Sequence, residues 1–450
     1  MSIASDLRLA RLLTRGADRL ERRRTTLTAL GAAVATGFAL AATGLASVQG
    51  QVWFPYGHGL LDQPGTRKGV VAGLLLLLIP VLAFLGQCAR IGAVHRDRRL
   101  AALRLSGAGP RQVRRIAALE AGLACLVGAV AGLLVFLALL AVVGRRPPPL
   151  AWPGFALVVL LIPVLAVLVS RVALRRVIAS PLGHVRRMRP GRGPGLLLGL
   201  WLPALLVVTG ASLIMARGAR SGYGALPLFV IGAVVLTGAG AIRVAGTSAR
   251  AIGRRLADRT ERPAVLLAAH RLQQDPWATS RSHATVVLVT VVGVATTGIG
   301  RVLVTELRAT RQHGSTAEPI GYYAFGLGLT GAAILVGLAI ALAALAVGTA
   351  ESLSARRSAL AVQAAAGVPR KVLARALLLE TALPLAPALV LATLGGTAIH
   401  AAYGLAVGQS VPWALPLLVP ALVYAACLLA TTTALPLLHR SANPAELRFA

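Results

Sequence analysis

The sequence predicts an all-α polytopic membrane protein with ten transmembrane helices, arranged as two parallel four-helix repeats plus a two-helix insert. Three observations carry this prediction: the composition, ten long apolar runs, and a duplication at a fixed shift. Hydrophobic residues make up 56% of the 450 residues and charged residues only 13%, whereas soluble domains carry about 25% charged residues. The mean hydropathy is +0.76. Such a composition excludes an ordinary soluble enzyme, a disordered chain and a fibrous repeat.

The apolar runs are long enough to cross a membrane, because a transmembrane helix needs about 20 consecutive apolar residues. Pro or paired Gly interrupts several of them, which membrane helices tolerate better than soluble helices do. Arg301 stands near the end of the seventh run, where its side chain can snorkel to the outer interface. The ten predicted spans are 25–48, 69–91, 116–143, 151–171, 195–216, 223–242, 284–305, 325–350, 374–402 and 412–438.

The lysines and arginines lie mostly between these runs, on one predicted side of the membrane. The formal net charge is +32 and aromatic residues are scarce at 4%, which favours the positive-inside rule over nucleic-acid binding. With ten spans, the side that holds both termini carries 37 Lys and Arg, and the other side carries 9. We therefore expect a multi-pass protein of the bacterial cytoplasmic membrane, with cytoplasmic termini and short outer loops without a large extracellular domain.

Neither a metal site nor a nucleotide site is expected. Cys88, Cys125 and Cys427 lie in or at the ends of apolar runs without metal-ligand spacing, so we interpret them as small core residues. A P-loop needs Gly-x-x-x-x-Gly-Lys-Ser/Thr, and neither Lys68 nor Lys371 stands in such a loop. We expect the chain to be no enzyme and to bind no cofactor.

A shift of 260 residues aligns the chain with itself without gaps. Val34-Ala35-Thr36 then meets Val294-Ala295-Thr296, and the first four spans meet the last four. An even number of inserted spans keeps both repeats in the same orientation, so they are parallel rather than inverted repeats. The predicted domains are a first repeat at 1–190, an insert and linker at 191–260, and a second repeat at 261–450.

The segment before the third span of each repeat shows the same order of features. A short basic helix is followed by a glycine, a proline and basic residues, and a glutamate stands thirteen residues after the glycine. One interpretation is a basic juxtamembrane turn that binds anionic lipid. The repetition of the order favours docking to a partner. The candidate residues are Arg98, Arg99, Leu100, Leu103, Gly107, Pro110 and Arg111 in the first repeat, and Arg356, Arg357, Leu360, Gly367, Pro369, Arg370 and Lys371 in the second.

Two glutamates, Glu120 and Glu380, end these two segments near the cytoplasmic membrane boundary. An intramembrane carboxylate is a functional candidate by default, and a proton relay is one such role. Both stand close enough to the surface to pair with a nearby arginine, for example Arg115 or Arg375. We therefore expect structural ion pairs.

Aromatic residues gather at the outer ends of the spans. The sequence places Trp53, Phe54 and Tyr56 in one outer loop, and Tyr322 and Tyr323 at the start of another span. An aromatic belt at the interface accounts for them, and a rim that contacts substrate is the alternative.

Two Gly-x-x-x-Gly pairs are candidates for close contact between helices. They are Gly69 with Gly73 and Gly128 with Gly132. Such pairs are common in glycine-rich spans, so the pattern alone does not show that either pair makes a close helix contact.

These features together resemble the FtsX-like permease family of ABC transporters, the group that includes the MacB-type and bacitracin-export-type permeases. The resemblance rests on the four-span unit, the Gly–Pro–basic turn and the following glutamate. It also rests on tails such as Ser180-Pro181-Leu182-Gly183 and Asn443-Pro444-Ala445-Glu446. Better-known members carry a large extracellular domain after the first span of a repeat, whereas the corresponding loops here, 49–68 and 306–323, are short.

The resemblance implies a function for the two juxtamembrane segments, 96–113 and 356–371. In this family such segments are coupling helices, which sit on an ATPase and pass its motion to the membrane helices. The chain would then be a permease subunit that exports or extracts an amphipathic substrate, such as an antimicrobial peptide, drug or lipid. An ATPase dimer with ATP and Mg²⁺ would dock on one permease chain, amid membrane lipids and without nucleic acid. An ion-coupled secondary transporter and a non-transporting scaffold or regulator are the alternatives.

Overall fold

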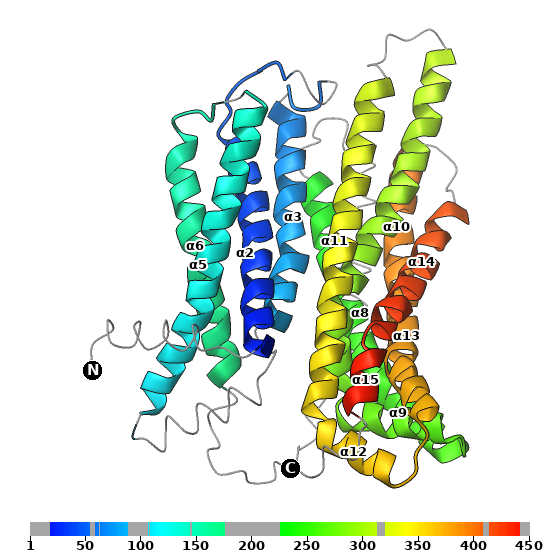
Figure 1. The fold of residues 1–450 in the computed structure, drawn as a ribbon. Helices are drawn as coiled ribbons and strands as arrows, with labels where there is room; N and C mark the ends of the chain where they lie inside the picture. The colour runs from blue at the N-terminus through cyan, green and yellow to red at the C-terminus, as the bar shows by residue number, and fades with distance from the viewer. Residues whose placement is uncertain are drawn as a thin grey trace. The chain divides into compact units, whose positions relative to one another are not determined.

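The computed structural model describes residues 19–54, 59–62, 64–88, 107, 109–144, 146–175, 226–312, 320–407 and 414–441. Within these ranges the chain forms α-helices and connecting turns, with no strand (Figure 1). The all-α prediction is therefore confirmed for the described residues. The chain divides into two compact units, Met1–Met188 and Arg189–Ala450.

The first unit packs around its first described helix, α2. This helix contacts the other three helices, and α5 also contacts α6. The buried Leu40 of α2 lies against Phe155 of α6, whose ring meets the ring of Phe136 of α5 edge-on at 5.4 Å between centroids. The helices are α2 (Arg19–Ala46), α3 (Pro64–Cys88), α5 (Pro110–Val142) and α6 (Ala151–Arg175).

Two glycines allow α5 to lie directly on the backbone of α2. A Cβ atom added at Gly128 would stand 2.0 Å from the carbonyl oxygen of Ala29, and one at Gly132 would stand 2.6 Å from that of Ala33. Only a residue without a side chain fits this approach. By contrast, a Cβ atom at Gly69 or Gly73 would meet no atom within 4 Å. Close helix contact is thus confirmed for the second glycine pair and wrong for the first.

The second unit is a bundle with three short helices at one end. Helix α10 packs against α8, α11, α13 and α14, and α13 packs against α8, α9 and α14. Figure 1 shows α9, α12 and α15 together at one end of the long helices. The helices are α8 (Leu226–Arg259), α9 (Pro263–Gln274), α10 (Pro276–Gln312), α11 (Ile320–Ala355), α12 (Arg357–Ala365), α13 (Arg370–Val407), α14 (Ala414–Thr432) and α15 (Leu435–Ser441).

The two units use the same helix pairs. In the first unit α2 contacts α3, α5 and α6, and α6 contacts α3 and α5. In the second unit α10 contacts α11, α13 and α14, and α14 contacts α11 and α13. At the 260-residue shift these are corresponding pairs, and Gly128 and Gly132 correspond to the fully buried Ala388 and Ala392. The agreement supports the duplication, while the symmetry between the repeats and the domain limits stay predictions.

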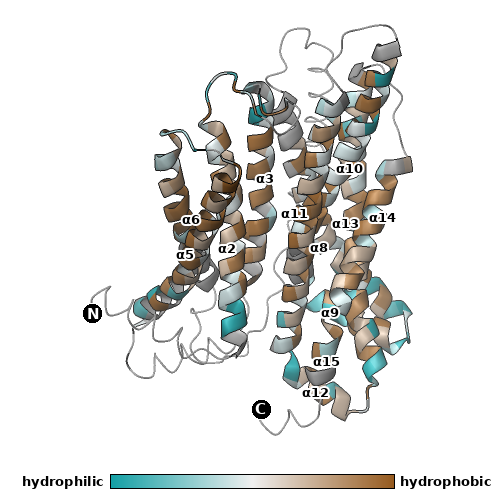
Figure 2. Ribbon diagram, turned by 45° about the horizontal axis from the view of Figure 1, so that its top comes forward, coloured by the Kyte–Doolittle hydropathy of each residue, from teal (hydrophilic) through white to brown (hydrophobic). Residues whose placement is uncertain are grey.

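Six described helices are long and apolar enough to cross a membrane, which supports an integral membrane protein. Figure 2 shows hydrophobic residues along the long helices and hydrophilic residues around α9 and α12. The predicted spans 69–91, 151–171 and 223–242 fall on α3, α6 and α8, which are helical but not among the six. The predicted span 195–216 lies outside the described residues. The six are Arg22–Ala46, Leu119–Val142, His283–Ala309, Gly321–Ser354, Arg370–Leu405 and Pro416–Leu438.

Cysteine labelling tests the predicted sidedness at two exposed turns. Pro149 precedes α6 and Ala366 follows α12, and both residues are exposed. The native Cys88, Cys125 and Cys427 are buried and give a low background. In intact cells we expect Pro149→Cys to react with a membrane-impermeant maleimide and Ala366→Cys to react only after lysis, because the basic segments remain inside. Labelling in the reverse order would contradict the topology.

Candidate functional site

The short helix α12 joins α11 to α13 at the end of the second unit, and its apolar side is buried in that unit. Leu360 is only 8% exposed. It forms a cluster with Leu353 of α11, Leu373 of α13 and Leu438 of α15. Leu360 therefore fixes α12 to its own bundle. This corrects its prediction as a residue that contacts a partner.

The opposite side of α12 is open. Val362 is 54% exposed, and Arg357, in the first turn of α12, is exposed as well. After the turn, Pro369, Arg370 and Lys371 are exposed as well. We call these five residues the α12 surface. It combines one apolar side chain in the middle of α12 with three cations, and this composition suits a partner that offers an apolar recess among acidic groups.

The turn after α12 has a defined backbone conformation. Gly367 has a φ of +86°. The Gly367 N–H donates to the Ala364 carbonyl at 3.0 Å, and the Val368 N–H donates to the Gln363 carbonyl at 3.1 Å. These are the two bonds of a Schellman motif, which ends a helix with glycine in the left-handed region. Gly107, which corresponds to Gly367 at the 260-residue shift, has a φ of +94°.

Valine in place of Gly367 should strain this turn without a steric collision. A Cβ atom there would meet no atom within 4 Å, so the cost is backbone strain alone, about 1–3 kcal/mol for an unfavourable left-handed residue. We expect Gly367→Val to lower the midpoint of thermal unfolding. Asparagine tolerates this region, so Gly367→Asn should stay near the wild-type midpoint. Equal midpoints for the valine and asparagine variants would contradict the strain.

An ion pair holds the start of α12 to α13. Arg356 Nη1 donates to Glu380 Oε1 and Oε2, each at 3.2 Å, and Arg356 Nε donates to the Ser352 carbonyl at 3.1 Å. One side chain thus links the end of α11, the start of α12 and the body of α13. The sequence suggested Arg375 as the partner of Glu380, but the Arg375 side chain is exposed.

A second arginine, from α9, approaches the same carboxylate. Burial and the Arg356 guanidinium lower the pKa of Arg271 from its ordinary value, and the carboxylates of Glu380 and Asp275 oppose this shift. Glu380 therefore offsets the repulsion between two guanidinium groups. The cluster ties α9, α12 and α13 together at one end of the unit.

The first unit has its own ion pair at the corresponding glutamate. Glu120 pairs with Arg24 of α2, and both side chains are almost fully buried. Removing one partner of such a pair leaves an uncompensated charge, which is strongly destabilising. Both glutamates are thus held in ion pairs as expected, Glu120 with Arg24 and Glu380 with Arg356. This arrangement favours structural pairing over a proton relay.

The remaining predicted coupling residues are only partly described. Gly107 keeps its positive φ, Gly109 is the N-cap of α5, and Pro110 and Arg111 form its first turn. The other members, Arg98, Arg99, Leu100 and Leu103, lie outside the described residues.

The aromatic residues of the possible outer rim fall into two groups, one in each unit. Trp53 is 73% exposed in the loop after α2, and the Phe54 N–H donates to Asp62 Oδ1 at 2.9 Å. Tyr322 and Tyr323, in the first turn of α11, have ring centroids 5.0 Å apart. Tyr56 lies outside the described residues. The rim stays a prediction.

Arg67 is a structural residue that sequence reasoning missed. Its guanidinium donates to the carbonyl oxygens of Val48 at 2.8 Å, of Gly50, and of Asp62 at 3.2 Å. The side chain is 3% exposed. Arg67 therefore holds the loop between α2 and α3 against the first turn of α3. Nothing in the spacing of the sequence pointed to this role.

Comparison with known proteins gives one family match. Residues 70–182 and 331–440 match the FtsX-like permease C-terminal domain. No curated protein matches the chain. The two matched segments contain α5 and α13 with the turns that precede them, and thus Gly107, Gly367 and both paired glutamates. Each half of the chain therefore holds a segment similar to the FtsX-like permease C-terminal domain, and this family suggests the membrane subunit of an ABC transporter.

Proposed function

We propose that the chain couples ATP hydrolysis by a separate ABC-type ATPase to the export or extraction of an amphipathic or lipid-like substrate. The observation that carries this proposal is α12: a short helix with an exposed basic face, clamped to the membrane bundle at one end. The two FtsX-like domains and the six apolar helices support it. ATP and Mg²⁺ would be bound by the partner.

The clamp explains how motion would pass from a partner to the membrane helices. A partner that contacts the α12 surface would push on a helix whose far side is fixed by Leu360. Its start is fixed to α11 and α13 through Arg356 and Glu380, and its end by the Gly367 turn. Because these joints are packed or hydrogen-bonded, α12 would act as a rigid lever rather than a flexible linker.

The duplication sets the proposed stoichiometry. Two repeats supply two coupling segments, 96–113 and 356–371, so one chain would seat an ATPase dimer. The charge distribution supports a cytoplasmic location for these segments and for both termini in a bacterial membrane. The short connections from α2 to α3 and from α10 to α11 support a MacB-type or bacitracin-export-type relative without a large extracellular domain.

An ion-coupled transporter is the main alternative. That mechanism uses ionisable groups and broken helices near the middle of the membrane. In the described part of the chain, Glu120 and Glu380 are held in ion pairs within the first third of α5 and α13. This placement favours a structural role and the ATP-driven mechanism. A scaffold or regulator without transport would lack substrate-stimulated hydrolysis.

Co-purification followed by an activity measurement tests the proposal. The full-length chain is purified from native membranes, and any ATPase bound to it is identified and reconstituted with it in nanodiscs. We expect no hydrolysis by the chain alone, and hydrolysis by the complex that rises with an amphipathic substrate. Robust hydrolysis by the chain free of partner, or transport driven by an ion gradient without ATP, would contradict the proposal.

A further inference from the structure

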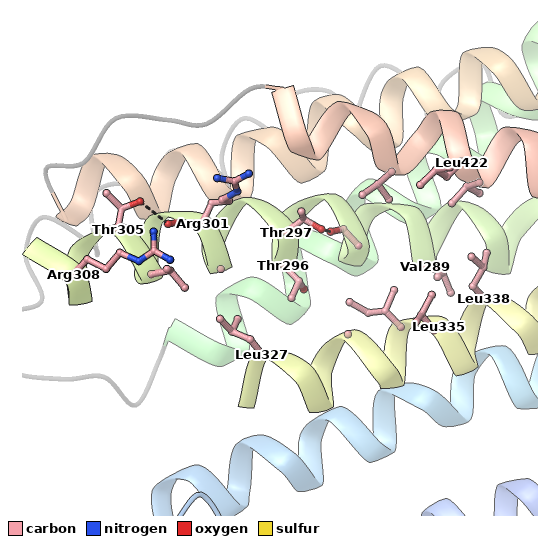
Figure 3. Close-up of a pocket in the computed structure, with 17 residues that line it drawn as sticks. Val289, Thr296, Thr297, Arg301, Thr305, Arg308, Leu327, Leu335, Leu338 and Leu422 are labelled. Atoms are coloured by element: carbon pink, nitrogen blue, oxygen red, sulfur yellow. Dashed lines mark hydrogen bonds between the residues drawn. The ribbon is translucent and has the colours of Figure 1, made fainter. Parts of the chain in front are cut away.

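The second unit contains a pocket that the coupling mechanism does not use. It lies between α10, α11 and α14 and has a volume of about 650 Å³ (Figure 3). This volume is within the range of small-molecule sites, about 300–1,000 Å³. All three helices are among those able to cross a membrane, so the pocket is a membrane-facing site rather than a soluble cleft.

The pocket is charged at one end and apolar at the other. Figure 3 shows Arg301 and Arg308 at one end with Thr305 between them, and Leu335 and Leu422 toward the other end. The two arginines and the threonine stand four and three residues apart, so they share one face of α10. The Thr305 hydroxyl donates to the Arg301 carbonyl at 2.9 Å, which leaves its oxygen free to accept a further bond.

Arg301 and Arg308 pair with none of the carboxylates whose side chains the structure describes, and both arginine side chains are exposed. Arg301 stands near the outer end of its predicted span and Arg308 just beyond it, where arginine side chains reach the level of the lipid headgroups. Two such arginines on one face, at the mouth of an apolar pocket, match an anionic group attached to a hydrocarbon chain.

The part of the pocket that lies below Arg301, down to Val289, matches the depth of one membrane leaflet. Arg301 and Val289 both line it, and twelve residues of α-helix separate them along α10, which corresponds to about 18 Å. Half of the hydrocarbon core is about 15 Å thick. Because α10 starts beside α9 and α9 packs near α12, the arginines lie at the end of α10 away from the coupling helix.

The first unit offers no counterpart to this site. At the 260-residue shift, Arg301, Thr305 and Arg308 correspond to Ala41, Leu45 and Val48. The fold of the four-helix unit therefore does not require the two arginines. Their presence in one unit alone points to a ligand rather than to a structural need.

We propose that this pocket binds an amphiphile with one hydrocarbon chain and an anionic headgroup, taken from the leaflet opposite the coupling helix. The headgroup lies between Arg301 and Arg308, and the chain runs along Leu335 and Leu422. Cationic amphipathic peptides are disfavoured because they would place positive charge beside two guanidinium groups. As a substrate site, the pocket rests on the proposed transport function; as a binding site, it does not.

Photolabelling of the full-length protein in nanodiscs tests the site. The probe is a monoalkyl phosphate with a diazirine in its chain, and the corresponding alcohol is the uncharged control. For wild type, we expect the phosphate probe to label residues of α10, α11 and α14. The double variant Arg301→Ala/Arg308→Ala should lose labelling by the phosphate probe at least about tenfold, because each arginine attracts the headgroup independently. Labelling by the alcohol should stay unchanged.

Matched variants distinguish the pocket from the general lipid surface. Gly331 lines the pocket, and a Cβ atom there would meet no atom within 4 Å, so Gly331→Phe fills the pocket without striking the backbone. It should abolish labelling by both probes. Gly328, on the same helix, is equally open but does not line the pocket, so Gly328→Phe should label as wild type does. Arg146, an exposed arginine in the α5–α6 loop, gives the charge control Arg146→Ala.

Several results would overturn the site. One is phosphate labelling that survives the double arginine variant, and another is equal labelling of Gly331→Phe and Gly328→Phe. Unlabelled lysophosphatidylglycerol, a lipid with one acyl chain, distinguishes the source of the headgroup, since its competition identifies a membrane lipid as the occupant and its failure identifies a free amphiphile. The photolabelling assay contains no ATPase, so its result does not depend on transport. If the pocket is labelled but the same phosphate amphiphile does not change hydrolysis by the reconstituted complex, the binding site stands and its role as a substrate site is rejected.

Discussion

Valine at Gly128 should separate α2 from α5 and destabilise the first unit more than any other single change considered. The added Cβ would lie 2.0 Å from the Ala29 carbonyl oxygen, which is backbone and cannot swing away. The two helices must move apart, and the close packing between α2 and α5 is lost. Overpacking a tight interface costs about 1–3 kcal/mol and occasionally more, and a collision with backbone belongs at the upper end. The measurement is the midpoint of unfolding in detergent, with tryptophan fluorescence as the signal.

The matched control is Gly73→Val. Gly73 stands in α3 in the same kind of Gly-x-x-x-Gly pair, but a Cβ atom there would meet no atom within 4 Å. Gly73→Val should therefore unfold within a degree or two of wild type, as expected for a substitution that touches nothing. If Gly128→Val unfolds at the same midpoint as Gly73→Val, the close approach of α5 to α2 is not present in the membrane-embedded protein.

Reversing two charges on the α12 surface should remove the proposed ATPase contact while leaving the fold intact. Arg370 and Lys371 are both exposed after the Gly367 turn, so glutamate at both positions breaks no buried contact. Like charges facing each other across an interface cost several kcal/mol, which corresponds to a loss of affinity well above tenfold. We expect Arg370→Glu/Lys371→Glu to abolish both ATPase association and substrate-stimulated hydrolysis in nanodiscs.

The same experiment decides between the partner and lipid interpretations of the turn. If the basic residues only bind anionic lipid, charge reversal will change lipid affinity and leave the ATPase attached. Arg146→Glu, an exposed arginine in the α5–α6 loop, is the matched control and should leave hydrolysis unchanged. Normal association and normal hydrolysis in the double variant would assign the α12 surface to lipid.

The local backbone features of the site were predictable from the sequence. A glycine followed closely by proline and basic residues indicates a helix end and a new helix start. The positive φ values of Gly107 and Gly367 follow that pattern. Apolar run length predicted most of the long helices, because 20 residues without charge have few alternatives to a membrane helix.

The partners of the charged residues were not predictable in the same way. Glu120 and Arg24 are separated by 96 positions, and Glu380 and Arg356 by 24. Such pairs depend on how whole helices pack, so proximity in sequence suggested the wrong arginine for Glu380. The burial of Leu360 has the same origin. An apolar face on a short helix indicates that another surface packs against it. Only the structure shows that this surface belongs to the same unit and includes α15.

The pocket is the clearest example of a feature that depends on helix packing and that the sequence did not reveal. Arg301 alone suggested a snorkelling side chain at the end of a span. Its significance comes from Arg308 on the same face and from the leucines that α11 and α14 bring beside it. Those helices follow α10 at very different distances along the chain, so periodicity within α10 gives no sign of the pocket.

Site-specific crosslinking from Val362 tests the central claim most directly, namely that α12 seats an ATPase. Val362 is 54% exposed on the α12 surface, and Val390 of α13 is 60% exposed within an apolar span. A photoreactive amino acid is placed at each position in turn, and cells that express the full-length chain are irradiated. The account predicts that position 362 yields an adduct with a P-loop ATPase and that position 390 yields only lipid adducts. ATPase adducts of equal yield at both positions, or none at position 362, would contradict it.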